Sequence, residues 1–471
     1  MMKRIFTGLL CLMASWASAQ PTSTALAFSG ESPTDLLEMV EGKPQPLGVL
    51  DTKEESVTLL NIHGSNTVGE SLAPSLAVAY LKAKGLEDVK VEETAVKNEK
   101  VIKGVLASQG KTVQIKIAAH GSSTGFKGLM SGAADIWASS RPVKDKEVDA
   151  AKLMTNLRDQ NSEHVVGIDG LAIIVHPENS VTSVTTENLG RIFSGEITNW
   201  SELGGPNLAI SLYARDDNSG TWDSFKKMVL GKTYKLSAAA ARYESSERLS
   251  DNVSRDRGGI GFIGMAFVRD AKLLAIADGP AQALQPTKLS VGTEDYALSR
   301  RLFLYSDDNP ANLYVHEFIR FAEGIRGQEI VQLSGFVSQN VSAINPELDE
   351  DLPQEYVTLV NGAERLSVNF RFQEGSAKLD NKAIKDIERL VYFLKQRGQE
   401  NELMLIGFGD KRKNESRSKL LSKLRAMAVR RELVRHGVYP KETTGYGEFN
   451  PVASFNGSGR SKNRRVEVWL R

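Results

Sequence analysis

Apolar and polar positions follow two different periods along the chain. Residues 113–117 carry apolar side chains at every second position, the period of a β-strand. Residues 171–175 form a short, uninterrupted apolar run, which also favours a strand. Between such segments the apolar spacing becomes helical, as in residues 71–84. This alternation predicts an α/β region with a parallel or mixed sheet and helices on both faces over about residues 57–340.

The last hundred residues repeat this contrast on a smaller scale. The apolar run 403–406 and Gly407 predict a strand that ends just before Asp410, and residues 420–426, which include Arg425, have helical spacing. A carboxylate that faces a guanidinium can grip both ends of an amino acid, because it binds the ammonium while the guanidinium fork binds the carboxylate. Taken alone, the pair fits a surface salt bridge better.

The first residues have the composition of an export signal. Within residues 1–19, Lys3 and Arg4 precede the apolar stretch 6–16, and small residues follow as a cleavage site. The stretch is shorter than the roughly 20 apolar residues of a membrane span, and no later segment could cross a bilayer. Cys11 is the only cysteine, so we expect a mature chain without thiol chemistry, exported to the periplasm of a diderm bacterium.

Length and composition predict several folded units. A chain of 471 residues is too long for one ordinary domain, and its 41% hydrophobic and 25% charged content is typical of globular protein. We expect a poorly ordered leader over residues 20–56 and an acidic, Pro-containing linker over residues 341–364. The large α/β domain then spans residues 57–340 and the small C-terminal domain residues 365–471.

The net charge of +1 conceals a division between these units. From Arg365 onward there are 24 Lys/Arg against 12 Asp/Glu, a balance of +12, whereas the rest of the chain has 35 against 46, a balance of −11. A basic module suits an anionic polymer such as peptidoglycan, or an acidic lipid surface. Nucleic acid is disfavoured as a partner, because an exported chain rarely meets it and no aromatic-basic recognition motif is present.

Three segments of the large domain share a strand, a turn rich in Gly, Ser and Thr, and a helix. They are residues 64–69, 121–125 and 218–221. Amide groups at a helix start, together with the helix dipole, favour a bound anion, and small residues let the backbone approach it closely. Arg215 precedes the third turn by four residues and can add a forked cationic contact. Any one such turn is weak evidence, because Ser and Thr cap helices everywhere.

These segments resemble the phosphate-binding (PstS-like) members of the periplasmic solute-binding proteins that serve ABC transporters. The run Arg215-Asp216-Asp217-Asn218-Ser219-Gly220-Thr221 has that family's Arg and Ser-Gly-Thr at the matching spacing, and residues 132–136, 192–200 and 258–262 add further matches. The resemblance implies a two-lobed Venus flytrap, crossed by the chain near residues 167–172 and 265–300, and an ABC permease as a candidate partner. By position, the phosphate contacts would be Thr67, Val68, Ser122, Ser140, Arg215, Ser219, Gly220 and Thr221.

Ser140 departs from many members of that family, which carry an Asp at this position. The carboxylate can accept the proton of hydrogen phosphate, whereas it repels fully ionised sulfate. Because Ser140 and Arg141 replace that arrangement, the ligand can be phosphate or a similar oxyanion such as sulfate, with phosphate favoured.

The C-terminal segment resembles the peptidoglycan-associating domain of the outer-membrane protein A (OmpA) family. Five motifs in order carry this resemblance: residues 372–379, 407–410, 421–426, 445–453 and 459–468. It implies a small α+β fold in which Asp410 and Arg425 hold the diaminopimelate of the peptide stem. The family's usual His-Thr before the Asp is Phe408-Gly409 here, and its usual Asn before Leu-Ser is Ser418. Both departures affect the loop that presents Asp410.

Enzymatic readings are weaker. Residues 121–125 match the Gly-x-Ser-x-Gly nucleophile elbow, but none of the later histidines lies in a recognisable catalytic setting. The mature chain lacks cysteine and has no His pair with zinc-ligand spacing, so we expect neither a metal nor another cofactor.

Together these patterns predict a periplasmic protein that binds phosphate and is anchored non-covalently to peptidoglycan, close to the outer membrane. Anchoring is unusual for a transport receptor, which should diffuse to its permease. The alternative is therefore a structural or sensing protein of the cell envelope, whose flytrap binds another protein or no longer binds phosphate.

Overall fold

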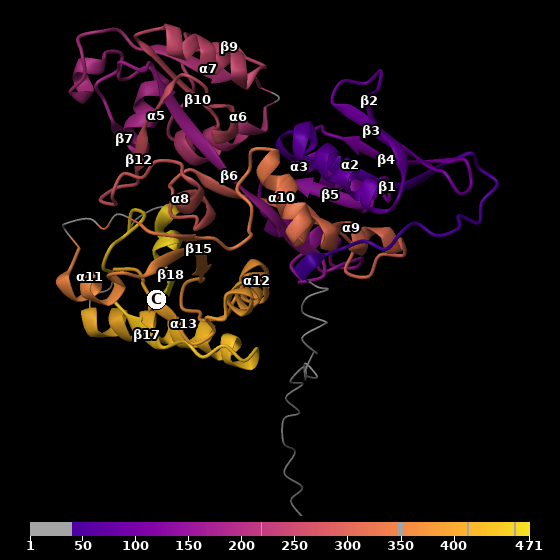
Figure 1. Cartoon of the computed structure of the whole chain (residues 1–471). Coiled ribbons are helices and arrows are strands. Elements are labelled where there is room, and N and C mark those ends of the chain that lie inside the picture. Colours follow the sequence, from indigo (N-terminus) through magenta and orange to yellow (C-terminus); the bar gives the residue numbers. More distant parts are fainter. Residues whose placement is uncertain (1–39, 218, 347, 349–351, 412–413, 456–457) are drawn as a thin grey trace, which may run out of the picture.

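The computed structural model describes residues 40–471 except 218, 347, 349–351, 412–413 and 456–457. These residues form two α/β lobes and a smaller C-terminal domain that lies against them (Figure 1). Among them, one sheet of eleven strands runs through both lobes, and a five-stranded sheet belongs to the C-terminal domain. The predicted order of a two-lobed α/β domain and a small α+β domain is confirmed.

The first lobe consists of β1 (Ser56–Gly64), η1 (Val68–Leu72), α2 (Ala73–Ala83), β2 (Glu87–Glu93), β3 (Glu99–Leu106), β4 (Lys111–Ala118), α3 (Ser122–Met130), β5 (Ile136–Ser139), α4 (Asp145–Ala151), β13 (Ser299–Tyr305), α9 (Leu313–Glu323) and α10 (Ile325–Leu333). β4 has the predicted alternation, with Val113, Ile115 and Ile117 buried. β1 is parallel to β4 on one side and to β5 on the other. The carboxyl ends of these three strands therefore lie side by side.

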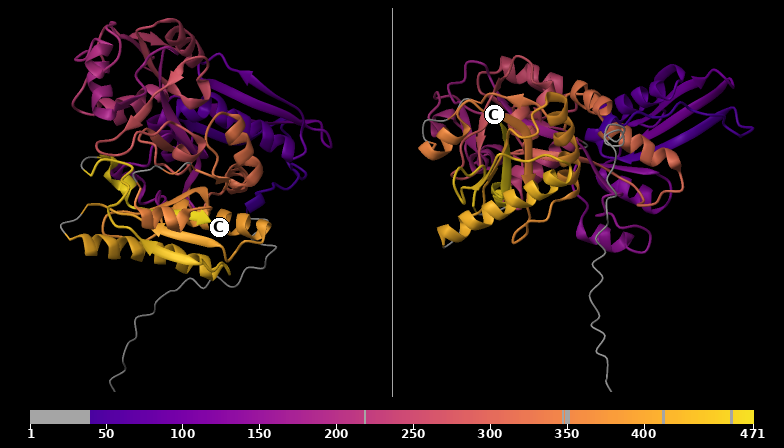
Figure 2. Two further views of the ribbon diagram at one scale, coloured as in Figure 1. Left: turned by 60° about the vertical axis from the view of Figure 1, so that its left-hand side comes forward. Right: turned by 60° about the horizontal axis from the view of Figure 1, so that its bottom comes forward.

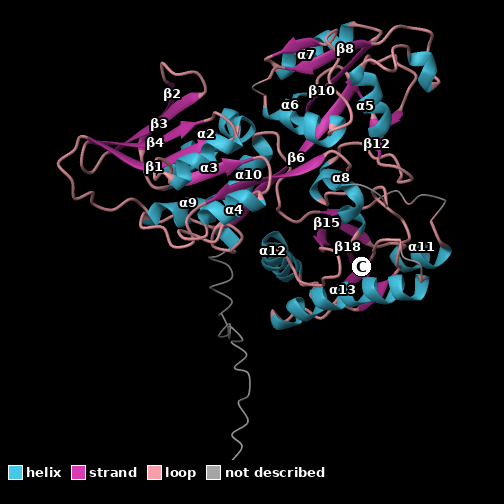
Figure 3. Ribbon diagram, turned by 180° about the vertical axis from the view of Figure 1, so that it is seen from behind, coloured by secondary structure: helices cyan, strands magenta, loops and turns pink. Residues whose placement is uncertain are grey.

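The second lobe contains β7 (Ser183–Thr185), α5 (Thr186–Ser194), η2 (Trp200–Leu203), β8 (Ser211–Arg215), α6 (Gly220–Phe225), η3 (Lys226–Leu230), β9 (Ala241–Tyr243), α7 (Ser246–Arg255), β10 (Gly259–Gly264), η4 (Met265–Phe267), β11 (Lys272–Leu273), β12 (Ala275–Ala277) and α8 (Lys288–Gly292). β8 is parallel to β9 and β10. In the interior of this lobe Phe225 and Phe262 stack with 3.9 Å between their ring centroids, and Phe193 meets both rings edge-on. Helices lie on either side of the strands (Figure 3).

One strand, β6 (Glu163–Val175), passes through both lobes. Its first half pairs with β13 up to Gly170, and its second half pairs with β10 from Leu171 onward. The strand is buried at every position after the first, as its apolar sequence requires. The chain returns to the first lobe at Leu298, whose carbonyl accepts a hydrogen bond from the Leu171 amide at 3.0 Å. Both crossings lie within the two predicted ranges.

The C-terminal domain comprises β14 (Ala343–Ile344), α11 (Gln354–Val360), β15 (Glu364–Arg371), α12 (Asn381–Arg397), β16 (Leu403–Gly407), α13 (Glu415–Arg435), β17 (Glu442–Gly445), η5 (Ser458–Asn463) and β18 (Arg465–Leu470). Its sheet has the order β14-β15-β18-β16-β17. Asp380 caps α12 by accepting a hydrogen bond from the Ala383 amide, and Asn414 caps α13 in the same way. Within the described part of the chain, every helix is too short or too polar to span a bilayer.

The segment that we expected to be a linker contributes to this domain instead. β14 pairs with β15, so residues 343–344 form an edge of the sheet. On α11, Tyr356 and Val360 are buried against a group that includes Phe408 and Trp469. The acidic run within the segment lies partly outside the described residues. These elements could not be predicted from the sequence, because an edge strand of two residues and a helix of two turns are too short to show a clear periodicity.

The end of the expected leader is also packed. Val40 is buried in the core of the C-terminal domain, and Leu47 is buried in the core of the first lobe. The amide of Leu47 donates to the carbonyl of Lys84 at 2.9 Å. This part of the expected leader is therefore packed against both folded units, contrary to expectation, whereas the expected export signal (residues 1–19) and residues 20–39 lie outside the described residues.

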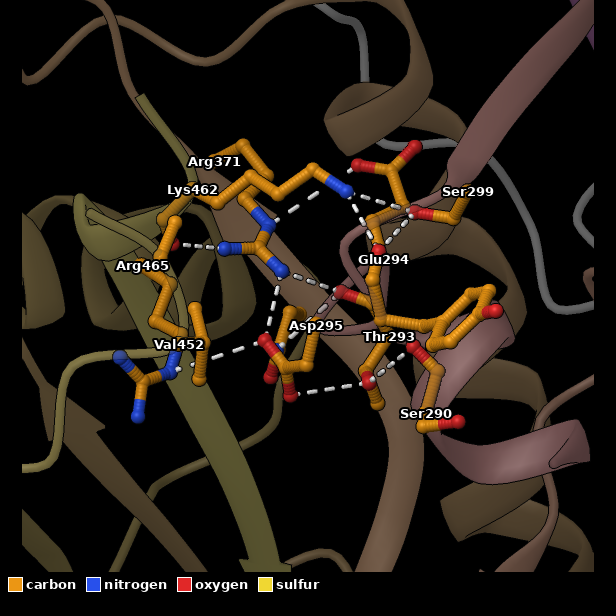
Figure 4. A network of polar contacts seen from close by, with 12 residues as sticks. Ser290, Thr293, Glu294, Asp295, Ser299, Arg371, Val452, Lys462 and Arg465 are labelled. Carbon is orange, nitrogen blue, oxygen red and sulfur yellow. Dashed lines mark hydrogen bonds and ion pairs between the residues drawn. The ribbon is translucent and has the colours of Figure 1, made fainter. Parts of the chain in front are cut away.

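The C-terminal domain rests on the segment through which the chain returns between the lobes. α12 packs against β6, and β15 packs against α8. Figure 2 shows the C-terminal domain, coloured orange to yellow, against the lobes from two further sides. Between them lies a buried cluster of charges (Figure 4). Arg371 Nη2 donates to Asp295 Oδ1 at 2.6 Å, and Arg465 Nε lies 3.8 Å from the same oxygen. Lys462 donates to the Ala297 carbonyl at 3.0 Å and to Ser299 Oγ at 2.9 Å.

Charges in this cluster have displaced pKa values. Burial alone would raise the pKa of Glu294, but Arg301 and then Lys382 outweigh burial and lower it from 4.5 to about 2. Burial lowers the pKa of Lys462 from 10.5 to about 8, and the neighbouring Arg371 acts in the same direction. Burial opposes ionisation of Asp295 as well, but Arg371 and then Arg465 outweigh it, so that the pKa of Asp295 also lies below its ordinary value.

We expect Glu294 to make the free energy of unfolding depend on acid. The folded pKa of about 2 lies below the ordinary 4.5, so this contribution is complete above about pH 4.5 and is lost as pH falls toward 2. The difference in unfolding free energy between the wild type and Glu294→Gln should shrink by about 3 kcal/mol over that range in urea titrations. The exposed Glu55 gives the control Glu55→Gln, and a pH-independent difference for Glu294→Gln would contradict the assignment.

Candidate functional site

The expected anion contacts of the first lobe lie in three turns at one edge of its sheet. Thr67 precedes η1 after β1, Ser122 begins α3 after β4, and Ser140 follows β5. Because β4, β1 and β5 are parallel neighbours, their carboxyl ends bring these turns together. The Ser140 amide donates to Ser122 Oγ at 3.2 Å, which joins two of the turns directly.

The expected turn at residues 219–221 comes from the second lobe. Ser219 caps α6, and its Oγ accepts hydrogen bonds from the amides of Thr221 at 3.2 Å and Trp222 at 3.5 Å. Gly220 lies against Thr67 of the first lobe, because a Cβ on Gly220 would overlap Thr67 Oγ1. The turns from the two lobes are therefore in contact, and only glycine fits at this position.

A small cavity lies where these turns meet. Its volume is about 20 Å³, which is room for about one water molecule. The walls are formed by Thr67, Glu70, Ser71, Asp169, Arg215, Ser219, Gly220, Thr221, Gly264, Phe267 and Phe336. Five of the expected contacts are thus gathered around one space, whereas Val68, Ser122 and Ser140 are not part of its wall. Val68 is fully buried at the start of η1.

Arg215 lies in this wall, but its guanidinium is already used. Its Nε donates to the Tyr243 carbonyl at 3.2 Å, its Nη2 donates to the Glu244 carbonyl at 2.7 Å, and its Nη1 donates to Ser246 Oγ. Burial lowers the pKa of Arg215. The guanidinium that was predicted to bind the anion therefore binds residues 243–246 instead. Only its remaining N–H groups are available to a ligand.

Two charged residues at this cavity were missed by the sequence reasoning. Arg300 on β13 and Asp169 on β6 form an ion pair of 2.7 Å and are about nine-tenths buried or more. Arg300 also donates to the Gly220 carbonyl at 2.8 Å and to Thr67 Oγ1 at 3.0 Å, so that it touches both lobes. Asp169 lies inside the first predicted crossing, residues 167–172, and Arg300 lies at the end of the second, residues 265–300. Their positions in the crossings were the only sequence feature that could have indicated a place beside the cavity.

Arg141, which follows Ser140 in the chain, forms an ion pair with Glu147. Its guanidinium binds the carboxylate of Glu147 with both branches, at 2.7 and 2.8 Å, and donates to Ser123 Oγ at 3.3 Å. Desolvation opposes ionisation of Glu147, yet the hydrogen bond from Arg141 leaves the pKa of Glu147 below its ordinary value. Arg141 therefore anchors the turn that holds Ser140.

Asp410 and Arg425 lie in the C-terminal domain as predicted, after a strand and on the next helix. β16 ends three residues before Asp410, and Arg425 lies within α13. Both side chains are buried, with exposures of 3%. A Cβ on Gly409 would lie 3.2 Å from Arg425 Nη1, so the guanidinium reaches the residue beside Asp410.

The carboxylate of Asp410 has a cationic partner that the sequence reasoning did not assign. Its Oδ2 accepts a hydrogen bond from Arg464 Nη1 at 2.8 Å and lies 3.4 Å from Arg460 Nη2. Its Oδ1 is buried and has no hydrogen-bond partner among the described residues. The segment 459–468, predicted only as a match to the OmpA family, thus supplies a contact to the site through Arg464.

Arg425 is oriented by backbone and ring contacts. Its Nε lies 3.5 Å from the Ser376 carbonyl, its Nη1 lies 3.5 Å from the Phe408 carbonyl, and its centre lies 5.8 Å from the Phe372 ring. Phe408, one of the two departures from the family pattern, is fully buried, and the Arg465 guanidinium lies 4.1 Å from its ring. The departure therefore gains a cation–π contact inside the domain.

Comparisons with known proteins match both parts of the chain. Residues 71–323 match the family described as a PBP superfamily domain, and residues 371–465 match the OmpA family. The phosphate-binding protein PstS of Borreliella burgdorferi is 29% identical over 225 residues, which are 46% of this chain and 77% of that protein. The protein SphX of Synechococcus elongatus is 33% identical over 226 residues, which are 45% of this chain and 66% of that protein.

Among solved structures, an ABC-type phosphate transport receptor from Vibrio cholerae is similar, with a TM-score of 0.46 and 24% identity over 59% of this chain and 99% of the receptor. The match over residues 71–323 takes in more than half of the chain and contains all of the expected anion contacts except Thr67 and Val68. The chain therefore belongs to the PBP superfamily and carries a C-terminal domain of the OmpA family.

Proposed function

We propose that this protein is a periplasmic receptor that binds inorganic phosphate between its two lobes and is moored to peptidoglycan by its C-terminal domain. The observation that carries the receptor part is the meeting of the Thr67 turn and the 219–221 turn around one cavity. The relative named as a phosphate-binding protein supports the same ligand. We expect binding and release without chemical conversion of the ligand.

The chemistry of the cavity suits an oxyanion. The Ser219 hydroxyl accepts from two backbone amides, so its own proton remains available to donate to a ligand. Thr221 adds a second hydroxyl, and α6 with η3 continues without a break behind it, which aligns peptide dipoles toward the turn. Arg215 brings positive charge to the wall. Anions with several oxygens can use these donors together.

Two carboxylates in the wall bear on selectivity. Glu70 and Asp169 both line the cavity, although Ser140 replaces the acid found in many relatives. A carboxylate can accept the proton of hydrogen phosphate, whereas it repels sulfate, which has no proton to offer. Phosphate therefore remains the favoured ligand. Glu70 or Asp169 would accept its proton, which Ser140 cannot do as a carboxylate does.

The mooring part rests on Asp410 and Arg425. The buried Oδ1 of Asp410 can accept a hydrogen bond from the ammonium of diaminopimelate. Arg425, held beside Gly409, can bind the carboxylate of the same amino acid. The chain would then stay at the wall while its flytrap samples the surrounding solution, with an ABC permease as the candidate recipient.

A second candidate function is favoured by the size of the cavity. About 20 Å³ is too small for a tetrahedral oxyanion, so the turns must separate for a ligand to enter and then close around it in a slightly wider arrangement. If they do not separate, the flytrap is a rigid platform, and the protein is a structural or sensing component of the envelope.

We expect the full mature chain to bind phosphate in calorimetric titrations and to bind sulfate at least tenfold more weakly. Gly220→Ala should weaken phosphate binding by at least tenfold, about 1.4 kcal/mol, because its Cβ collides with Thr67 and prevents closure. Gly48 has open space around its Cβ position, so Gly48→Ala is the matched control. No heat with either anion would exclude the receptor and favour the platform.

We expect the full chain to pellet with purified peptidoglycan, and both Asp410→Ala and Arg425→Ala to remain in the supernatant. Either change removes one end of the grip on diaminopimelate. Arg430 is exposed on the same helix, so Arg430→Ala controls for the loss of a positive charge. Thermal unfolding establishes that the variants are folded, because Asp410→Ala leaves Arg464 without its carboxylate. Normal pelleting of both folded variants would rule out the mooring.

A further inference from the structure

Two consecutive arginines on β13 point in opposite directions. Successive side chains of a strand lie on opposite faces of the sheet. Arg300 lies behind the wall of the anion cavity, where it binds the wall residues Asp169, Thr67 and Gly220. Arg301 reaches the C-terminal domain, where its Nη1 donates to Asp380 Oδ2 at 2.7 Å. A single strand therefore contacts both the residues around the anion cavity and the C-terminal domain.

The contacts of Arg300 belong to the closed arrangement of the lobes. Its guanidinium donates to Asp169 Oδ2 through Nε at 2.9 Å and through Nη2 at 2.7 Å. The same group bridges the Gly220 carbonyl of the second lobe and Thr67 Oγ1 of the first. Separation of the lobes must break at least one side of this bridge.

The mouth of the cleft is closed by a further contact. Lys97, on the β2–β3 hairpin of the first lobe, lies 2.6 Å from Glu244 of the second lobe. Both side chains are about seven-tenths exposed, so this ion pair contributes little by itself. It marks the position of the mouth and shows that the lobes approach each other there as well as at the turns.

The C-terminal domain holds the return segment between the lobes. Glu294, with a φ of 61°, begins a turn that leads into β13, and Arg301 binds its carboxylate. Asp295 accepts hydrogen bonds from Arg371 and, at 3.0 and 3.1 Å, from Asn369 of β15 (Figure 4). A hinge works by changing its backbone angles, and here the segment that would change is bonded on both sides of the turn.

The same domain also contacts each lobe separately. Asn381 at the start of α12 donates to Glu163 Oε1 of the first lobe at 3.3 Å. Gly459 lies against Asp278 of the second lobe so closely that a Cβ would overlap the carboxylate. A rotation of one lobe against the other would therefore separate the C-terminal domain from at least one of them.

We infer that the docked C-terminal domain is a brace across the hinge, which stabilises the closed flytrap and thereby sets the affinity for the oxyanion. The regulation of phosphate affinity rests on the proposed function, whereas the brace itself does not. Because linkage is reciprocal, a ligand that closes the lobes also strengthens docking of the C-terminal domain. The wall anchor is thus part of the device that retains the ligand.

Asp380→Asn tests the brace with little disturbance elsewhere. Asparagine still caps α12, but it removes the ion pair with Arg301 and leaves every residue of the cavity unchanged. Asn414→Asp, the converse exchange at the cap of α13, is the matched control. Lys462→Met, which removes the contacts to the return segment, is a second brace variant. Thermal unfolding of all variants establishes that the C-terminal domain is folded.

The separation of the two lobes is measured as the distance between two spin labels, one on each lobe at the mouth of the cleft. The mature chain is expected to lack cysteine, so Val96→Cys in the first lobe and Arg248→Cys in the second, both exposed, provide the labelling sites. In the full chain without ligand we expect one short distance. Asp380→Asn and Lys462→Met should add a longer one, and Asn414→Asp should not. An unchanged distance in both brace variants would overturn the inference.

Phosphate then separates the brace from the proposed function. With phosphate as the probe, Asp380→Asn should bind about fivefold more weakly than the wild type, and saturation should restore the short distance. If the variants open but the wild type binds no phosphate, the brace stands and the receptor function fails. Equal affinity of variant and wild type, with phosphate bound, would overturn the coupling.

Discussion

The architecture depends on the pairing of β6 with strands of both lobes. Its backbone groups bond to β13 up to Gly170 and to β10 beyond it, and its side chains are buried along nearly the whole length. A break in the strand would leave buried amides and carbonyls without partners, which is costly. The two lobes therefore share one continuous element. This sharing places the turn at Thr67 opposite the turn at Gly220.

Buried charges orient the C-terminal domain on that frame. Arg371 and Arg465 come from its sheet, and Asp295 comes from the return segment of the flytrap. Removing such groups from water is expensive, so their net contribution to stability is small even when they are paired. Their geometry is demanding, however, and a displaced interface would leave buried charges unpaired. The cluster accordingly favours one docked orientation over others.

Arg215 and Arg300 show how burial assigns roles to similar side chains. Arg215 has the spacing of an anion ligand, yet its nitrogens hold the segment after β9. Arg300 has no such motif, yet it lies between Asp169 and both turns. A buried guanidinium must satisfy its donors wherever acceptors converge, and that convergence is a property of the folded chain. Arg215 therefore lies in the wall of the cavity, whereas Arg300 supports that wall from behind through Asp169.

The resemblance to the periplasmic solute-binding proteins located the two crossings. Local periodicity in the sequence was enough to predict the strand–turn–helix units and the positions of Asp410 after a strand and Arg425 on a helix. Each of these depends on hydrogen bonding and burial within a few residues, which leave a regular pattern. Only the tertiary structure decided the packing of residues 40–50 and 343–360, the place of Arg300 in the cleft, and the docking through Asp295. Those features join residues far apart in the chain, such as Thr67 and Arg300. The partner of a charged side chain cannot be predicted from the periodicity of the sequence around it.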